Sequence, residues 1–547
     1  MSPDSAPARP FQEYESEKLM RRIEREPLPA NVGALLKSAA EKYGDQPALY
    51  FFDDDVTLTY RQLEARTRKM ASAFAKLGIK HGTHVGIMVY TTDVYPTTWL
   101  ALARLGAVTV AINYNYTPRE LNYMLSDGKA EFLVMNHELL PTLEGMETQP
   151  VPKDRVIMVG ADVPGYPLRW ETALASGDEN FAPAKEPVLD DLMNIQYTSG
   201  TTGMPKGAMQ PQRYWLTFGR VGAAQFQDKL KRILLAQPFY YVDGQWLCLV
   251  TIYQGATLYV ARKQSASRFF GWVKQFKINY CNFPEVVSKQ PEKPDDKDND
   301  LIVISAYSHR RENYRWYEKR YGCLARQGFS MTEVGCGIYV PMEADHMTGT
   351  GTVGTPCAFR EAMVADAEGN PVPRGEVGEL CIRGAGILQG YFNKPEANAK
   401  SFHPGGWFRT GDTARHDPDG WFYYLGRIKD MVKRSGENVS AVEVEGVLRG
   451  VDGIMEAAVL PVPDELRGEE VKAYLLLAPG RTAKDVTPET VVAHCEKNLA
   501  KFKIPRYLEY VTEFPRTPSL KIKKSALIAA KPDLRVGSYD RQEKAWK

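Results

Sequence analysis

Apolar residues in the first part of the chain recur with two different periods. Four of them share one face of a predicted helix that ends at Gly78: Leu63, Met70, Phe74 and Leu77. Short apolar and β-branched runs predict strands over 85–90, 107–112 and 131–134. Helices are predicted between these strands, through 99–105 and from Pro118. This alternation predicts a parallel sheet covered by helices on both faces.

Two predicted helices begin at capping boxes. Thr59 pairs with Gln62, and Ser440 pairs with Glu443. In such a box the hydroxyl accepts a backbone hydrogen bond while the Gln or Glu side chain accepts one from the cap residue. Both pairs therefore fix where a helix starts.

A second, smaller unit is predicted towards the C-terminal end. The chain is rich in glycine from 406 to 436, which indicates tight turns or a hinge. Beyond it, strands and a helix form a compact piece of about one hundred residues; they are predicted over 457–462, 471–477 and from Pro488. We expect an α/β protein with a large domain over 1–428 and a small α+β domain over 429–547.

Composition and charge exclude several classes of protein. The 547 residues include 69 basic and 67 acidic ones, so the net charge of +2 creates no global field that attracts nucleic acid or an anionic membrane. No apolar run is long enough to span a membrane, and the N-terminus has no apolar signal segment, so a cytoplasmic protein is expected. The seven cysteines lack metal-binding spacing and are predicted to be reduced core residues.

The segment Tyr197–Gly207, YTSGTTGMPKG, predicts a polyphosphate site at the end of a strand. Its glycines let backbone N–H groups approach phosphate oxygens, its hydroxyls add donors, and its lysine adds a mobile positive charge. These residues are Thr198, Ser199, Gly200, Thr201, Thr202, Gly203, Lys206 and Gly207.

A Walker loop and a flexible linker are the alternatives for this segment. In a Walker loop glycine precedes the lysine and a magnesium-binding hydroxyl follows it, whereas here Pro205 precedes Lys206 and Gly207 follows. A Ser/Thr/Gly linker needs neither the lysine nor the preceding strand. Nucleotide chemistry other than that of a P-loop NTPase is therefore favoured.

Seven motifs in order give the chain a resemblance to a known superfamily. They are YTSGTTGMPKG at 197, FSMTE at 329, GTVGTP at 351, GELCIRG at 378, FRTGD at 408, GRIKDMVKRSGENVSAVEVE at 426 and PRTPSLKIKK at 515. The chain resembles adenylate-forming enzymes: acyl-CoA synthetases, nonribosomal adenylation domains and firefly-type luciferases. KRSGENVSAVEVE and PFYYVDGQ look most similar to carnitine and crotonobetaine CoA ligase-like members. The resemblance implies stacked mixed and parallel sheets with helices, plus a small mobile C-terminal domain.

The resemblance also implies a two-step reaction. A carboxylic acid attacks ATP to give acyl-AMP and pyrophosphate, and the CoA thiol then gives acyl-CoA and AMP. Thr198, Ser199, Thr201, Thr202 and Lys206 would hold the leaving phosphates. Glu333 would bind Mg²⁺ and Thr332 would bind the α-phosphate or the acid. Phe329, Ser330 and Met331 would line the adenine site, Asp412 would bind the ribose and Arg427 would contact the nucleotide.

Lys521 matches the lysine that bridges the acid carboxylate and the α-phosphate in the superfamily. Leu520 replaces the glycine that usually precedes it, and leucine resists a positive φ. The resemblance makes Lys429 the hinge and places Gly436 at the path of the CoA thiol. No general base is expected.

The acid itself is predicted only by class. The resemblance gives the acyl pocket four residues: Tyr241, Ala306, Tyr307 and Gly328. Tyr307 would shorten the pocket, and His309, Arg310 or Arg311 would meet a second anionic group unless the arginines begin an exposed helix. We expect a compact polar, aromatic or dicarboxylic acid, with no nucleic-acid partner.

Three function classes stay open at this point. The first is an acid–CoA ligase. The second is an adenylating enzyme that loads a carrier protein or another acceptor. The third is a catalytically impaired binder, which the leucine at 520 would explain. A homodimer is left open as the assembly.

Overall fold

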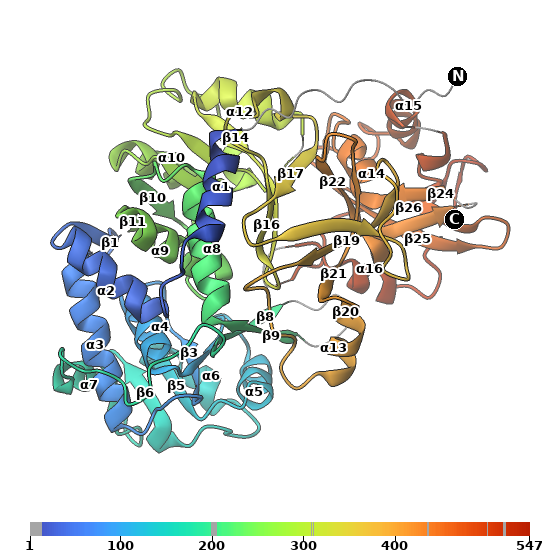
Figure 1. The fold of residues 1–547 in the computed structure, drawn as a ribbon. Helices are drawn as coiled ribbons and strands as arrows, with labels where there is room; N and C mark the ends of the chain where they lie inside the picture. The colour runs from blue at the N-terminus through green and yellow to red at the C-terminus, as the bar shows by residue number, and fades with distance from the viewer. Residues whose placement is uncertain are drawn as a thin grey trace.

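The computed structural model describes residues 14–198, 205–307, 309, 311–434, 437–499, 501–517 and 521–547. Figure 1 shows a large N-terminal part and a smaller C-terminal part beside it. Within the described residues, four sheets and the helices packed on them make up these parts. The two-domain α/β organisation expected from the sequence is present.

The first sheet comes from the predicted N-terminal strands and helices. Its order is β7-β6-β5-β3-β4-β8-β9, and all its neighbours are parallel except β8 and β9. Its strands are β3 (His84–Met88), β4 (Val108–Ala111), β5 (Phe132–Asn136), β6 (Val156–Val159), β7 (Leu168–Arg169), β8 (Leu192–Thr198) and β9 (Lys206–Pro211). The described residues of the phosphate segment lie at the end of β8 and the start of β9, at the edge of this sheet.

The second sheet has the order β14-β13-β12-β10-β11-β1-β2 and is parallel except for β1 and β2. Its strands are β1 (Pro47–Phe51), β2 (Val56–Thr59), β10 (Arg232–Leu235), β11 (Thr257–Val260), β12 (Tyr280–Asn282), β13 (Val303–Ser305) and β14 (Leu324–Arg326). Both parallel sheets need helices on their two faces, since each face is apolar.

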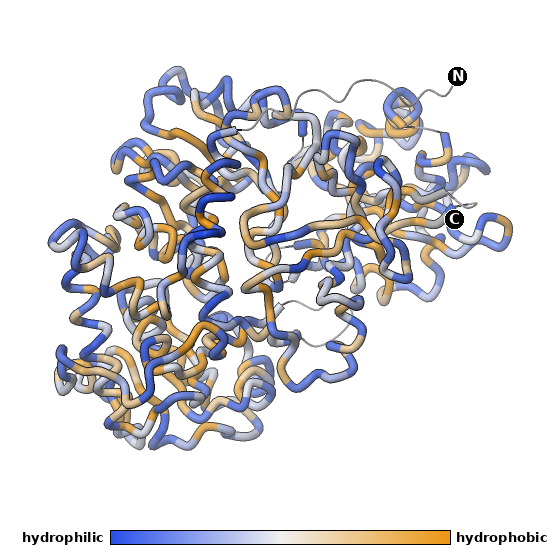
Figure 2. The backbone as a smooth tube through the Cα atoms, in the orientation of Figure 1, coloured by the Kyte–Doolittle hydropathy of each residue, from blue (hydrophilic) through white to orange (hydrophobic). Residues whose placement is uncertain are grey.

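One shared core lies between these two sheets, and hydrophobic segments gather there (Figure 2). The helices that contribute to it are α2 (Val32–Tyr43), α3 (Tyr60–Lys76), α4 (Val94–Leu105), α8 (Gln212–Gln225) and α9 (Val242–Gln254). Val134 of β5 packs into this core, whereas its neighbour Leu133 packs into a separate cluster with α5. The alternation follows from the two-residue period of a strand.

The remaining helices of the large part cover outer surfaces. α5 (Pro118–Asp127) and α6 (Leu140–Glu144) contribute to the outer core of the first sheet, and α10 (Ala266–Gln275), α11 (Glu285–Ser288) and α12 (Asn313–Tyr321) to that of the second. α1 (Glu15–Arg25) packs against α8, and α7 (Trp170–Ser176) packs against α3. α13 (Pro395–Ser401) lies beside β20 (Phe402–His403) and β21 (Trp407–His416). The large part is thus layered as helix, sheet, helix, sheet, helix.

Helices α8 and α9 approach so closely that glycine is required between them. A Cβ atom on Gly222 would lie 2.4 Å from the Trp246 Nε1 atom, and one on Gly219 would lie 2.7 Å from the Leu249 Cβ atom. Phe218 and Trp246 stack in the same interface with ring centroids 5.2 Å apart. The glycines therefore set the spacing of the two central helices.

Gly222→Ala is expected to lower the free energy of unfolding by about 1–3 kcal/mol, because the added methyl overpacks this interface. Chemical denaturation measures the change. Gly271→Ala in α10 is the matched control, since a Cβ there meets nothing within 4 Å. It should be neutral or stabilising by up to about 1 kcal/mol. Similar values for the two variants would contradict the packing argument.

The third sheet is antiparallel and belongs to the large part. Several of its residues line the cavity described below. Its order is β15-β16-β17-β22-β21-β19-β18, with β20 beside β21. Its strands are β15 (Gly328–Met331), β16 (Gly335–Tyr339), β17 (Thr352–Pro356), β18 (Glu361–Ala365), β19 (Val377–Arg383), β20 (Phe402–His403), β21 (Trp407–His416) and β22 (Phe422–Arg427).

The small C-terminal part has its own core, which includes Val432, Val444 and Leu475. Its sheet has the order β24-β23-β26-β27-β28-β29, with β25 beside β26. The strands are β23 (Met431–Arg434), β24 (Glu437–Ser440), β25 (Ile454–Asp464), β26 (Gly468–Leu477), β27 (Tyr507–Val511), β28 (Tyr539–Asp540) and β29 (Ala545–Trp546). The helices are α14 (Ala441–Leu448), α15 (Pro488–Asn498) and α16 (Lys524–Ala529).

The two predicted capping boxes have different outcomes. Thr59 and Gln62 form the full box at the start of α3. At α14 the Ser440 side chain accepts from the Glu443 backbone N–H as predicted, but the Glu443 carboxylate pairs with Lys503 at 2.7 Å. The second box is therefore only half formed, because a tertiary cation takes the carboxylate.

The other broad expectations about the fold are confirmed. The predicted strands and helices are present, with ends that shift by a few residues. All seven cysteines are buried and free. Among the described helices, none is both long and apolar enough to cross a membrane.

Candidate active site

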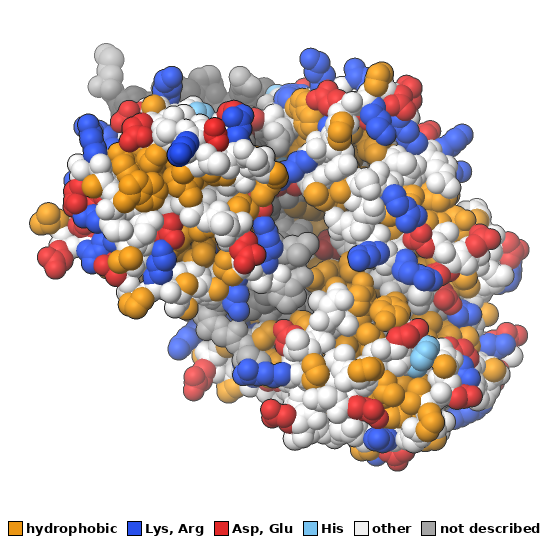
Figure 3. Space-filling model, turned by 180° about the vertical axis from the view of Figure 1, so that it is seen from behind, with side chains coloured by type: hydrophobic (Ala, Val, Ile, Leu, Met, Phe, Trp, Pro, Cys, Tyr) orange, Lys and Arg blue, Asp and Glu red, His pale blue; other side chains and the backbone are white. Residues whose placement is uncertain are grey.

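A large cavity lies between the two parts of the protein. Its volume is about 2750 Å³, and it is lined by the first and third sheets, by α9 and by residues of the small part. Figure 3, seen from behind, shows that the surface is hollowed between the two parts. Most of the described residues predicted from the sequence to act in binding or chemistry line this one cavity.

Asp412 and Arg427 form an ion pair in the cavity wall. They lie on the adjacent strands β21 and β22, and the Arg427 Nε atom is 2.9 Å from an Asp412 carboxylate oxygen. Arg427 also donates to the Thr410 carbonyl at 3.1 Å. Only 2% of Asp412 is exposed. Burial raises the pKa of Asp412 to about 7, although Arg427 and Lys521 act to lower it.

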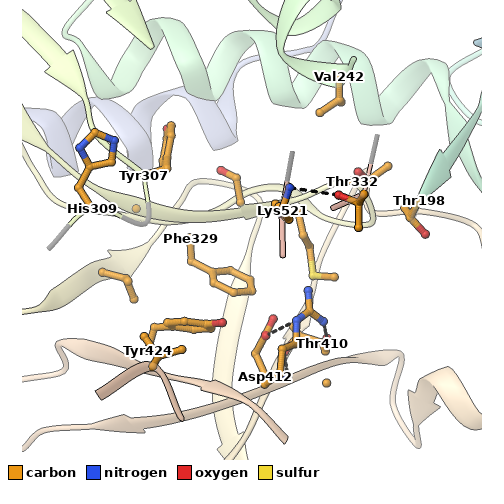
Figure 4. A pocket seen from close by; sticks show the side chains of 18 of the residues that line it. Thr198, Val242, Tyr307, His309, Phe329, Thr332, Thr410, Asp412, Tyr424 and Lys521 are labelled. Carbon is orange, nitrogen blue, oxygen red and sulfur yellow. Dashed lines mark hydrogen bonds and ion pairs between the residues drawn. The ribbon is translucent and has the colours of Figure 1, made fainter. Parts of the chain in front are cut away.

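Phe329 lies on β15 with its ring facing the cavity. Tyr424 of β22 lies near it, with ring centroids 6.3 Å apart, and Figure 4 shows both rings on the same side as Asp412. The neighbouring predicted residues Gly328, Ser330 and Met331 also line the cavity. Tyr424 was not predicted from the sequence. Two aromatic residues and one carboxylate thus mark a common end of the cavity.

Glu333 is a buried carboxylate with two cationic neighbours. The Tyr391 hydroxyl donates to it at 2.8 Å, and the Lys206 ammonium lies 4.3 Å from the centre of the Tyr391 ring. Burial raises the pKa of Glu333, whereas the charges of Arg427 and Lys206 favour its ionised form. Tyr391 belongs to none of the predicted motifs and lies 58 positions from Glu333 in the sequence, so pattern analysis missed it.

The Glu333 surroundings fit the magnesium ion that the resemblance implies. Mg²⁺ prefers oxygen ligands and is typically bound by one or two carboxylates together with substrate phosphates. Glu333 supplies the carboxylate, and Thr198 and Lys206 of the phosphate segment line the same cavity.

Thr332 and Lys521 come together from different parts of the chain. Both residues line the cavity, and Figure 4 draws them in the same region of it. Buried Gln210 of β9 donates to the Thr332 carbonyl at 2.8 Å, which fixes the backbone of the motif. The Lys521 N–H donates to the Thr517 hydroxyl at 3.2 Å. The small part therefore presents a lysine to the motif residues of the large part.

Helix α5 holds the described residues on both sides of the phosphate segment. The Tyr197 hydroxyl donates to Asp127 at 2.8 Å, and Asp127 also pairs with Lys394. The Tyr123 hydroxyl donates to the Pro205 carbonyl at 2.7 Å. Tyr123 and Asp127 are four residues apart, so they lie on one face of the helix. This support was not predicted from the sequence.

Aromatic residues dominate the other end of the cavity. Tyr241 caps the N-terminus of α9, and Tyr307 follows β13; both are half-buried and line the cavity. Ala306 does not line the cavity among the described residues, because it is fully buried in the core formed with α12. The prediction of Ala306 as a pocket residue is therefore wrong for its side chain.

The residues predicted to meet a second anion have other partners. Burial lowers the pKa of His309 to about 4, so this ring is neutral at physiological pH, and it contacts the Tyr317 hydroxyl at 2.8 Å. Arg311 is exposed and pairs with Glu312 at 2.9 Å. Neither residue supplies a free cation to the pocket. Arg310 lies outside the described residues.

Several further predicted residues lie outside the described part of the chain. They are Ser199, Gly200, Thr201, Thr202, Gly203, Gly436 and Leu520. The side chain of Lys429 is also outside it, although its backbone belongs to the short helix η4 (Ile428–Asp430).

A second cluster contains side chains of the kinds that bind metal ions, but an arginine already neutralises its negative charge. Glu379, Cys381 and His403 bring three possible ligand atoms within 4.8 Å of one another. The Glu379 carboxylate, however, pairs with Arg409 at 2.8 Å and accepts from the Gly411 N–H at 3.1 Å. Because an arginine supplies the positive charge, the cluster is explained as a structural ion pair.

Comparison with known proteins identifies the family. The model of the AMP-binding enzyme family matches residues 36–392, and the model of its C-terminal domain matches 443–521. The chain belongs to the AMP-binding enzyme family, which confirms the superfamily resemblance.

Relatives with names and solved structures narrow the class. A crotonobetaine/carnitine–CoA ligase of Salmonella paratyphi A is 30% identical over 517 residues, covering 91% of this chain and 98% of that protein. The anthranilate CoA ligase AuaEII, solved with anthranoyl-AMP, is 26% identical with a TM-score of 0.82, covering 92% of this chain and 98% of that one. ATP-bound MatB from Rhodopseudomonas palustris is 25% identical with a TM-score of 0.81, covering 91% and 99%. The protein is an AMP-forming acyl-CoA synthetase that uses ATP, a carboxylic acid and CoA.

Proposed function

We propose that the protein activates a compact polar or aromatic carboxylic acid, and that the residues described above have the following roles. The observation that carries the proposal is the meeting of Lys521, Thr332, Glu333 and Asp412 in one cavity. Two anions, the acid carboxylate and the α-phosphate of ATP, must approach each other in the first step. The Lys521 ammonium lies between the two parts of the protein and would stabilise the charge that develops there.

The nucleotide would bind at the end of the cavity marked by Phe329, Tyr424 and Asp412. The aromatic rings offer flat faces for adenine. The ionised Asp412 carboxylate would accept hydrogen bonds from the ribose hydroxyls, and Arg427 holds that carboxylate in place. Thr198 and Lys206 would bind the β- and γ-phosphates, with the phosphate segment supported by α5.

Glu333 would hold the magnesium ion, with Tyr391 orienting its carboxylate. When bound, the ion supplies positive charge that neutralises the phosphate oxygens. Thr332, fixed through Gln210, would donate its hydroxyl to the α-phosphate or to the acid. These residues position and neutralise charged groups, and none of them is needed as a general base.

The second half-reaction would require the small domain to rotate. We propose a hinge at Lys429, between domains over 1–428 and 429–547, with Gly436 facing the thiol of CoA afterwards. Such closure movements often limit turnover. A cytoplasmic location and a homodimeric assembly stay predictions.

The space at the acyl end is limited by Tyr241, Tyr307 and buried Trp246, which supports a compact acid over a long fatty chain.

The test of the proposed function is pyrophosphate release with ATP and Mg²⁺ across aliphatic, aromatic, dicarboxylic and zwitterionic acids. The reaction is run with and without CoA, and the products are identified by mass. We expect release with short or aromatic acids, and acyl-CoA with AMP when CoA is present. Faster turnover of palmitate would contradict the compact pocket. Acid-dependent release without acyl-CoA would indicate another acceptor, and no release with any acid would indicate the impaired binder.

A further inference from the structure

Lys524 begins helix α16, three residues after Lys521. Lys521 lines the cavity, whereas Lys524 is not among the described residues that do. The motif PRTPSLKIKK ends in Lys524, yet the proposed chemistry uses only Lys521 and gives this second lysine no role. The contacts of Lys524 therefore bear on how Lys521 is held, not on the reacting groups themselves.

Lys524 bridges two carboxylates of the small part. Its ammonium lies 2.7 Å from a Glu445 oxygen and 3.6 Å from an Asp430 oxygen. Glu445 is buried on α14, and the same carboxylate oxygen also accepts from the Val459 N–H at 2.8 Å. A buried carboxylate that has both a backbone donor and a cation is held firmly in one place. These three residues, Lys524, Glu445 and Asp430, are called the Lys524 bridge below.

Both carboxylates of the bridge belong to elements that adjoin the large part. Asp430 ends η4, the short helix that follows β22, and Glu445 lies on α14, which packs beside β22 (Figure 1). The Ser440 hydroxyl at the start of α14 donates to the Leu425 carbonyl of β22. The position of Lys524 is therefore tied to a strand of the large part.

The Lys524 bridge lies close to the nucleotide end of the cavity. Burial raises the pKa of Tyr424, the charges of Asp412, Asp430 and Glu445 add to this effect, and Arg427 opposes it. Tyr424 lines the cavity, so the two carboxylates of the bridge are near its wall. The bridge is thus placed where it can set the position of a group that acts on the nucleotide.

The chain from Lys524 back to Lys521 is short and constrained. Three residues span at most about 10 Å. The Lys523 N–H donates to the Pro515 carbonyl at 2.7 Å, and Ile522 packs against a hydrophobic cluster of the small part. A displacement of Lys524 would therefore move the backbone of Lys521, because little slack separates them.

We propose that Lys524 is a positioning residue, which fixes Lys521 in the cavity for the first half-reaction through its ion pairs with Glu445 and Asp430. The inference rests on the proposed function, since it concerns how the proposed Lys521 is held. Asp430 belongs to η4, where the hinge is proposed. The Lys524 bridge therefore supports the arrangement that carries out adenylation and not the rotated one.

Lys524→Gln is expected to lower the rate of acid-dependent pyrophosphate release by about 10- to 100-fold, because a slightly misplaced group loses much of its effect. Thioester formation from supplied acyl-AMP should be largely retained. Lys524→Arg keeps the charge and should restore most of the rate. Rapid-quench measurement of each half-reaction, with the acid that the panel above turns over fastest, gives both rates.

Glu445→Gln tests the same ion pair without leaving a buried charge unpaired. Its amide oxygen can still accept from the Val459 N–H, so the variant should fold and show the same difference between the two half-reactions. Lys531→Gln is the matched control. Lys531 pairs with Glu509 at 2.6 Å in the small part and is not among the described residues that line the cavity, so neither half-reaction should change.

A double variant separates positioning from a merely structural role. When Lys521 is already alanine, adding Lys524→Gln should slow adenylation little further, since the group to be positioned is gone. Unchanged pyrophosphate release in both Lys524→Gln and Glu445→Gln would overturn the proposal. Equal slowing of the two half-reactions, or losses that add in the double variant, would overturn it as well. Absence of release by the wild type with every acid tested would instead overturn the proposed function.

Discussion

Lys521→Ala is expected to lower the rate of acid-dependent pyrophosphate release by about 100- to 1000-fold, because it removes the positive charge placed between two approaching anions. Thioester formation from supplied acyl-AMP should be largely retained, since the α-phosphate bond is already made. Rapid-quench measurement of each half-reaction separates the two effects. The Lys521 side chain is exposed, so the variant should fold normally.

The matched control is Lys501→Ala, which removes another exposed lysine of the small part. It should change neither half-reaction by more than about threefold, as expected of a surface charge. If Lys521→Ala slows both half-reactions equally, the lysine does not act in adenylation as proposed.

Asp412→Asn is expected to lower kcat/KM for ATP by about 10- to 100-fold, because an amide replaces an ionised acceptor and leaves Arg427 without its partner. Asp419→Asn makes the same chemical change on the exposed turn between β21 and β22 and should have no effect. Equal losses in the two variants would remove Asp412 from the nucleotide site.

The Asp412–Arg427 pair also predicts how kcat/KM for ATP depends on pH. The direction of the change follows from the burial of Asp412. The raised pKa of about 7 means that Asp412 is protonated below that pH and ionised above it. Since the ionised form accepts both ribose hydroxyls, kcat/KM for ATP should rise between about pH 6 and pH 8 in the wild type. Titration of ATP itself affects both proteins, so the ratio of wild type to Asp412→Asn isolates the residue. A constant ratio would contradict the assignment.

Local patterns predicted the elements of the fold well. Apolar periodicity and Thr59 identified α3, and Pro118 marked the start of α5 at its first residue. These signals depend only on residues a few positions apart, so they can be recognised without knowledge of the tertiary structure. The second capping box failed in part because Lys503, sixty residues away, competes for Glu443.

Residues that act through tertiary contacts could not be predicted in the same way. Tyr391 reaches Glu333 across 58 positions, and Gln210 reaches Thr332 across 122. No periodicity links such pairs, since only the strand order brings them together. Ala306 shows the opposite error, because a resemblance gave its position but not the direction of its side chain.

The seven buried cysteines have a consequence for an enzyme whose substrate is a thiol. Burial raises the pKa of Cys248, Cys323, Cys381 and Cys495 to about 12, so these side chains stay as thiols at physiological pH. Disulfide exchange needs an accessible thiolate. Oxidised CoA would therefore find no partner on the folded protein, and glutathione disulfide would find none either. We expect the cysteines to remain free of mixed disulfides under oxidative stress, so that the redox state of the CoA pool limits the reaction before disulfide exchange on the enzyme does.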